Sequence, residues 1–132
     1  MPVQRVQLGK HVDARGSLIV GEHPNQLSFT PSRFFVISDV PIDELRGQHA
    51  HKSNEQIMIC LKGSLTAKFH DGTRWGQYQL NPDGEGIIVP AMHFGELSKF
   101  APGTILLVLA SEPYEPGEYI NTFEEFIDAL RN

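Results

Sequence analysis

The sequence predicts an all-β domain, a sandwich or barrel, followed by one C-terminal helix. Turn signals rich in Gly, Pro, Asn and Asp recur at short intervals, at residues 14–16, 81–84 and 101–103. Between them lie short segments rich in Val, Ile, Leu, Phe and Tyr. Many short strands separated by turns are typical of sandwiches and barrels. We expect strands at residues 17–22, 32–40, 56–61, 64–70, 75–80, 86–89 and 104–110.

Two turns are expected to close hairpins, at Lys62-Gly63 and at residues 70–73. The second contains Asp-Gly, which supplies the positive φ that tight hairpin turns require. His70 in this turn is therefore expected to be exposed. Trp75 follows on a strand, where a large aromatic side chain more often belongs to the core.

Only the C-terminal segment has a helical pattern. Thr122 and Glu125 have the spacing of a capping box, which satisfies free backbone N–H groups at a helix start. Apolar residues then share one helix face: Phe123, Phe126, Ile127 and Leu130. We expect this helix to pack on the outside of the barrel.

Composition places the chain among soluble globular proteins and fits one domain over residues 1–132. The chain is 40% hydrophobic and 20% charged, with a formal net charge of −5. The absence of long basic runs argues against nucleic-acid binding. A nucleotide-bearing ligand remains compatible with this charge, because a single arginine can hold phosphate inside an acidic protein.

The sequence also predicts a cytoplasmic protein with no membrane partner. Residues 1–5 carry no apolar signal segment, and the longest apolar run, residues 105–110, is too short for a bilayer. The single cysteine, Cys60, lies in an apolar run and cannot form an internal disulfide. We expect it to be a small buried hydrophobe.

The strongest chemical signal is the segment Arg46-Gly47-Gln48-His49-Ala50-His51. Side chains at positions i and i+2 of a strand face the same side, about 7 Å apart. Both imidazoles are therefore expected to face one cavity. Histidine ionises near neutral pH, so such a pair suits either proton transfer or metal binding.

One interpretation is a metal site. His49, His51 and Glu55 have the spacing of the first metal motif of cupin barrels, and such ligands suit Fe, Mn, Ni or Zn. The second cupin motif is incomplete. Met92 replaces its glycine, Gly95 stands in the place of its last histidine, and His93 lies two positions earlier. His93 is then a candidate fourth ligand.

The alternative is acid–base chemistry without a metal. One imidazole removes a proton from a carbon next to a ketone, and a neighbouring group handles the oxygen or returns the proton. A cation or hydrogen-bond donor can stabilise the resulting enolate. A third alternative is a barrel that binds a nucleotide or sugar without catalysis.

Nearly the whole chain resembles the WxcM-like sugar 3,4-ketoisomerases. The most specific shared segment is Arg46-Gly47-Gln48-His49-Ala50-His51-Lys52. The resemblance extends over Leu61-Lys62-Gly63-Ser64-Leu65, Gly86-Ile87-Ile88-Val89-Pro90 and residues 13–18, 33–35, 105–111, 114–120 and 123–126.

The resemblance implies a small cupin-type (jelly-roll) barrel that forms homodimers, often by exchanging N-terminal strands. It implies conversion of dTDP-4-keto-6-deoxyglucose into a 3-keto isomer, without a metal or other cofactor. His51 is then the base that takes the C3 proton, and His49 is its partner. Arg46 and Arg15 are expected to bind the diphosphate or to polarise the sugar ketone.

Three further residues are expected in the substrate site: Arg33, Glu55 and His93. Glu55 is expected to tune a histidine, and His93 to line the cavity. The sequence departs from the family pattern at two places. Phe34-Phe35 stands where the family carries a tyrosine that approaches the sugar, and Phe94 stands in the place of a tryptophan.

Overall fold

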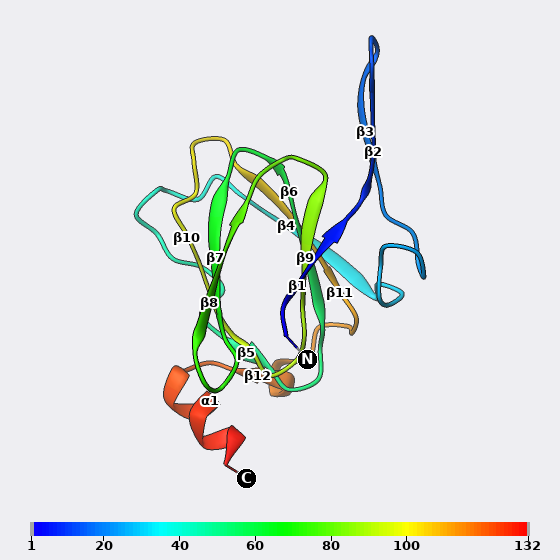
Figure 1. Ribbon diagram of the computed structural model, residues 1–132. Coiled ribbons are helices and arrows are strands. Elements are labelled where there is room, and N and C mark those ends of the chain that lie inside the picture. The colour runs from blue at the N-terminus through cyan, green and yellow to red at the C-terminus, as the bar shows by residue number, and fades with distance from the viewer. Residues whose placement is uncertain (1, 132) are drawn as a thin grey trace.

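Two antiparallel sheets face each other in the computed structural model, which describes residues 2–131 (Figure 1). The larger sheet has the order β1-β9-β6-β11-β4, with strands Gln4–Gln7, Glu85–Val89, Gln56–Lys62, Ile105–Ala110 and Arg33–Ser38. The smaller has the order β10-β7-β8, with strands Phe94–Ser98, Leu65–His70 and Trp75–Leu80. Neighbours in a sheet are often distant in sequence, as in a jelly roll. The predicted cupin-type barrel is confirmed.

Two shorter strand pairs complete the fold. Strands β2 (Gly9–Asp13) and β3 (Gly16–Val20) form a hairpin that projects from the barrel (Figure 1). Strands β5 (Ala50–His51) and β12 (Tyr119–Ile120) pair at the opposite end, next to the 3₁₀ helix η1 (Pro116–Glu118) and the helix α1 (Phe123–Leu130). Among the described residues, no helix has the length and apolar character needed to cross a bilayer.

All seven predicted strands are present, with small shifts at their ends. The sequence analysis did not predict β1, β2, β5, β10 or β12. Strands β1 and β2 are largely exposed and polar, so they lack a hydrophobic run. Strands β5 and β12 have two residues each, too few to show a period.

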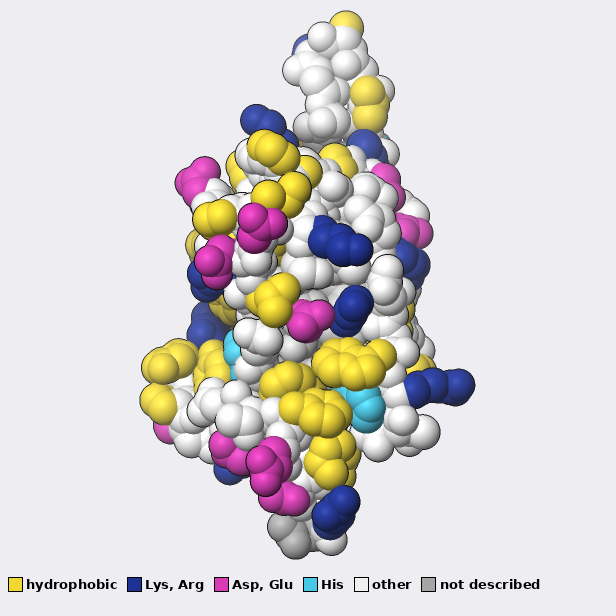
Figure 2. Space-filling view, turned by 90° about the vertical axis from the view of Figure 1, so that its left-hand side faces the viewer, with side chains coloured by type: hydrophobic (Ala, Val, Ile, Leu, Met, Phe, Trp, Pro, Cys, Tyr) yellow, Lys and Arg dark blue, Asp and Glu magenta, His cyan; other side chains and the backbone are white. Residues whose placement is uncertain are grey.

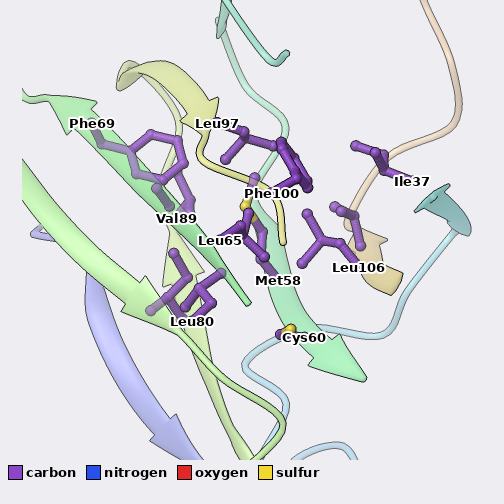
Figure 3. Packing of buried hydrophobic residues seen from close by; sticks show 13 residues of the cluster. Ile37, Met58, Cys60, Leu65, Phe69, Leu80, Val89, Leu97, Phe100 and Leu106 are labelled. Carbon is purple, nitrogen blue, oxygen red and sulfur yellow. The ribbon is translucent and has the colours of Figure 1, made fainter. Parts of the chain in front are cut away.

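The core lies between the sheets and follows the two-residue period of the strands. Met58 and Cys60 of β6 and Leu65 and Phe69 of β7 belong to one buried cluster inside the barrel (Figure 3). Cys60 is buried, as predicted. The alternate residues of β6 face the other way and pack with Leu27 and Phe29 in a second cluster.

The turn at Lys62-Gly63 is not a hairpin, contrary to the prediction. Strands β6 and β7 belong to different sheets, so this turn carries the chain across the barrel. Gly63 has φ +80, and a Cβ there would lie 2.7 Å from Thr104 Cα. Thr104 Oγ1 accepts a hydrogen bond from the Ser64 backbone N–H and donates one to the Ser64 carbonyl. These bonds hold Thr104 in place, so it cannot easily move away from an added Cβ. The predicted hairpin at residues 70–73 is confirmed by the pairing of β7 with β8.

His70 and Trp75 have the opposite environments to those predicted. They are paired across β7 and β8 on the outer face of the smaller sheet. His70 is only 9% exposed, because the rings of Trp75, Phe123 and Phe126 surround it. Trp75 is 47% exposed and stacks on Phe123. Apolar side chains gather on the lower part of this face, next to the C-terminal helix (Figure 2).

Helix α1 begins at Phe123, directly after the predicted cap. The Glu125 backbone N–H donates to Thr122 Oγ1 over 3.1 Å. Phe126 is fully buried against Ala50, Phe94 and Ile120, whereas Phe123 and Leu130 of the predicted face stay about two-fifths exposed. Because Ala50 belongs to β5 and Ile120 to β12, the helix holds this strand pair in place.

Replacing Gly63 by alanine is expected to lower the free energy of unfolding by about 2 kcal/mol, through backbone strain plus the clash with Thr104. Gly103→Ala is the matched control. Gly103 has a similar φ of +78, and no atom lies closer than 4.0 Å to its added Cβ. It should lose only about 1 kcal/mol. Urea denaturation measures both, and equal losses would contradict the proposed clash.

Candidate active site

The rings of His49 and His51 lie on the same side of the chain, as the strand period predicts. Their centroids are 5.0 Å apart with planes at 85°. Ala50 between them faces the opposite way, into the cluster around Phe126. The main chain fixes this segment, because the His49 carbonyl accepts from the Gly95 N–H and the His51 carbonyl from the Met92 N–H.

A buried carboxylate orients His51. Its Nδ1 lies 2.7 Å from Glu118 Oε1, and the two side chains are 7% and 9% exposed. Glu118 Oε2 also accepts from the backbone N–H groups of Ser53 and Asn54. Because an ionised carboxylate only accepts, Nδ1 carries a proton, and in the uncharged form of the imidazole Nε2 therefore keeps a free lone pair. Within residues 2–131, this buried Nε2 has no hydrogen-bond partner.

Burial alone would raise the pKa of Glu118. The hydrogen bonds from His51, Asn54 and Ser53 outweigh burial and lower the pKa below its ordinary value. Glu118 is therefore a carboxylate at neutral pH. Its negative charge can stabilise an imidazolium that forms on His51 during proton transfer.

His49 is an uncharged imidazole at neutral pH. Burial lowers its pKa from the ordinary 6.5 to about 4, and the neighbouring His51, Arg33 and Arg46 act in the same direction. Glu118 opposes the shift without cancelling it. His49 can therefore donate or accept a hydrogen bond there, but it does not carry a resting positive charge.

Tyr119 and Arg33 complete the site. The Tyr119 ring lies 4.5 Å from the His51 ring and 5.1 Å from the His49 ring, measured between centroids. Arg33 Nη2 donates to the Tyr119 hydroxyl over 3.0 Å. Arg33 was expected in the site from the sequence, and the structure brings it to this cluster.

Two other expected residues lie near the histidines along the chain but have different surroundings. Arg46 is exposed and pairs through its backbone with Leu97. Glu55 is half-buried, and its backbone is bound to Ser111. The carboxylate that contacts His51 is that of Glu118. The role expected for Glu55 therefore remains a prediction.

Arg15 and His93 are not brought to this cluster within one chain. Arg15 lies at the tip of the β2–β3 hairpin, paired with Asp13 over 2.7 Å and lining a cavity of about 270 Å³. His93 is buried, with Nδ1 3.1 Å from the Ala91 carbonyl, and lines a cavity of about 220 Å³ together with Asp71 and Trp75. His93 thus lines a cavity that His49 and His51 do not line, and the substrate contact expected of it stays a prediction.

The incomplete cupin motif has a clear structural form. Met92 stands at the position of its glycine and adopts φ +60, a conformation that glycine takes without strain. At Gly95, the position of the last motif histidine, a Cβ would lie 2.8 Å from Phe69 Cε1. Among the described residues, no group of three or more His, Cys, Asp or Glu side chains is placed to hold a metal ion.

Glu118 and Tyr119 are the site residues that the sequence analysis missed. Both lie in the segment 114–120 that supports the family resemblance, but they stand 67 or more positions from the histidines. A single sequence offers no sign that this segment folds back onto residues 49–51. The local signal for a site is limited to the adjacent carboxylate and phenol of Glu118-Tyr119, directly before the apolar Ile120.

Comparison with known proteins supports the same grouping. The family model described as "FdtA: WxcM-like, C-terminal" matches residues 1–131. The chain belongs to the WxcM-like family. A TDP-4-oxo-6-deoxy-alpha-D-glucose-3,4-oxoisomerase from Aneurinibacillus thermoaerophilus is 32% identical over 121 residues, covering 92% of this chain and 87% of that protein.

Solved structures of 3,4-ketoisomerases are also similar to this chain. A 3,4-ketoisomerase from Helicobacter canadensis has a TM-score of 0.96 at 33% identity, covering 100% of this chain and 99% of its own. A histidine-to-asparagine variant of the 3,4-ketoisomerase QdtA from Thermoanaerobacterium thermosaccharolyticum, in complex with TDP-4-keto-6-deoxyglucose, has a TM-score of 0.94 at 29% identity. It covers 98% of this chain and 94% of its own.

The depressed pKa of His49 predicts a pH dependence of stability. Between pH 6.5 and about 4 the unfolded chain binds a proton at this residue that the folded chain does not. Stability from this source is full above pH 6.5 and falls as the pH drops toward 4. In thermal unfolding, His49→Gln should therefore lose less stability than the wild type over this range. The exposed His11→Gln control should follow the wild type, and identical curves for His49→Gln would contradict the prediction.

Proposed function

We propose that this protein is a nucleotide-sugar 3,4-ketoisomerase that moves a keto group between C4 and C3 of a dTDP-linked 4-keto-6-deoxyhexose. The observation that carries the proposal is the buried His51–Glu118 pair, which leaves His51 Nε2 free beside His49. Membership of the WxcM-like family and the activities named for its relatives support the substrate class.

In the proposed mechanism His51 Nε2 removes the proton from C3. The C3–H electron pair forms a C3=C4 double bond, and the C4=O π pair moves onto O4, which gains a proton and becomes a hydroxyl of an enediol. The O3–H proton leaves in the second half of the reaction. Glu118 stabilises the imidazolium, which then delivers a proton to C4 while the C3 oxygen becomes the ketone. No net oxidation occurs. His49, uncharged at neutral pH, acts as its partner by hydrogen bonding to the sugar.

Other residues are assigned to binding. Arg46 borders the histidine segment, and its charge contributes to the field at His49, so it is suited to hold the diphosphate. Glu55 and His93 stay as predicted substrate contacts. The cytoplasmic location also remains a prediction from the sequence.

We further propose that the chain forms a homodimer. Phe34 and Val36 of β4 are 68% and 50% exposed at the edge of the larger sheet. Val12 and Leu18 of the projecting hairpin are 71% and 58% exposed. Such apolar surface on an edge strand and an arm favours coverage by a second copy. In a dimer, Arg15 at the hairpin tip could approach the partner subunit, consistent with its expected role in binding.

His51→Asn is expected to lower kcat by at least about a thousandfold, because the carbon base is lost. Binding of dTDP-4-keto-6-deoxyglucose should change little. Isomerisation is followed by NMR in heavy water, and binding by calorimetry. The exposed His23→Asn control should keep wild-type turnover. Turnover of His51→Asn near the wild-type rate would contradict the mechanism, and a wild type inactive on this sugar would contradict the function.

Light scattering tests the oligomeric state. The wild type should show twice the chain mass of 14.8 kDa. Phe34→Lys with Val36→Lys should give a monomer, because charges on an apolar interface oppose association. Trp75→Gln changes an exposed aromatic side chain on the other sheet and should leave the dimer intact. A monomeric wild type would contradict the proposal.

A further inference from the structure

We propose that Tyr119, held by Arg33, moves the protons on the substrate oxygens during the isomerisation, an inference that rests on the proposed function. The proposed reaction needs two kinds of proton transfer. One is at carbon, assigned to His51. The other is at the two oxygens, where a proton must reach O4 and another must leave O3.

The position of Tyr119 places a phenol at the two histidines. Tyr119 on β12 is the direct partner of His51 on β5, so the backbone pairing sets their distance. Its ring contacts both imidazoles, with centroid distances of 4.5 and 5.1 Å. Three side chains able to carry a proton therefore line one small region. His51 and Tyr119 come from the paired strands β5 and β12, and His49 from the residue before β5.

The hydroxyl of Tyr119 is arranged to donate. It accepts a hydrogen bond from Arg33 Nη2 over 3.0 Å, which occupies a lone pair and leaves the phenolic hydrogen available. Within residues 2–131 the structure gives this hydrogen no acceptor. The guanidinium also stabilises negative charge that develops on the phenol oxygen when the proton is given away.

Arg33 is itself fixed. Its Nε donates to the Glu112 carbonyl over 3.3 Å. The guanidinium carbon lies over the rings of Phe35 and Tyr114, 5.5 Å from each centroid. A charge held by three neighbours needs little reorganisation when the reaction begins, which is the condition for effective electrostatic stabilisation. We assign Arg33 as a positioning residue that acts through Tyr119.

This arrangement explains how the site functions without a tyrosine on β4. The family resemblance places a phenol on that strand, where this chain has Phe34-Phe35. Phe35 instead packs against Arg33, and the phenol comes from β12. Tyr114 is a poorer candidate, because it is 64% exposed and contacts Tyr119 rather than the histidines.

The proton balance closes. As His51 takes the C3 proton, Tyr119 gives its hydroxyl proton to O4, and the enediol and a phenolate form. As the imidazolium protonates C4, the O3–H bond breaks, its electron pair forms the C3 ketone, and the proton returns to Tyr119. Both residues regain their starting states, and no other reactant is required.

The test compares Tyr119→Phe with Tyr78→Phe, the same chemical change on β8, where the ring lies next to Arg5 and outside the proposed site. Tyr119→Phe should lower kcat by about a hundredfold or more with KM changed by less than about threefold, because the oxygen proton carrier is lost. Tyr78→Phe should keep kcat within about twofold of the wild type. Thermal unfolding of each variant checks that the fold is retained.

Arg33 variants give an independent reading. Arg33→Met should lower kcat strongly, and Arg33→Lys should recover part of it, because the lysine restores a positive charge near the phenol. If the wild type is active and Tyr119→Phe has the same kcat, the assignment of Tyr119 is overturned, while the isomerase function stands. Equal losses in Arg33→Met and Arg33→Lys would also count against it. A wild type inactive on dTDP-4-keto-6-deoxyglucose would overturn the function and this assignment together.

Discussion

The buried hydrogen bonds of Glu118 are the interaction on which the site depends. Strands β5 and β12 have only two residues each, so their pairing alone cannot hold the histidines rigidly. Glu118 ties the two segments together, because one carboxylate binds the imidazole of His51 and the backbone of Ser53 and Asn54. Removing a partner from such a buried network leaves a charge without compensation, which is costly. Glu118 therefore both stabilises the local fold and orients the proposed catalytic base.

The rest of the fold supports this group from both sides. Below it, Phe126 of α1 packs against Ala50 and Ile120, the apolar residues of the same two strands. Behind it, the buried Asn54 accepts hydrogen bonds from Ser111 and Glu112, the first residues after β11. Each contact joins the site to an element whose own position is fixed by the barrel. The histidines are thus placed by packing at long range as much as by their local sequence.

The periodicity and composition of the sequence predicted the features that depend on residues close together in the chain. They predicted the barrel, the helix cap at Thr122 and the common face of His49 and His51. They could not show that Glu118 reaches His51, because that contact depends on how the chain returns after β11. The same limit applies to His70 and Trp75. The residue pattern of β7 and β8 shows that side chains alternate between the two faces of the sheet. The position of α1 then decides which side chain of the outer face is covered, and it covers His70 more than Trp75.

Gly95 shows that the interior of this barrel is packed without a side chain at the position of the last cupin-motif histidine. The Phe69 ring already occupies the space that a side chain at position 95 would need. Installing an imidazole there would demand a simultaneous reduction of Phe69, and one substitution without the other would overpack the core. A histidine at position 95 therefore requires a second substitution at position 69. Engineers wishing to convert this scaffold would have to alter both positions together.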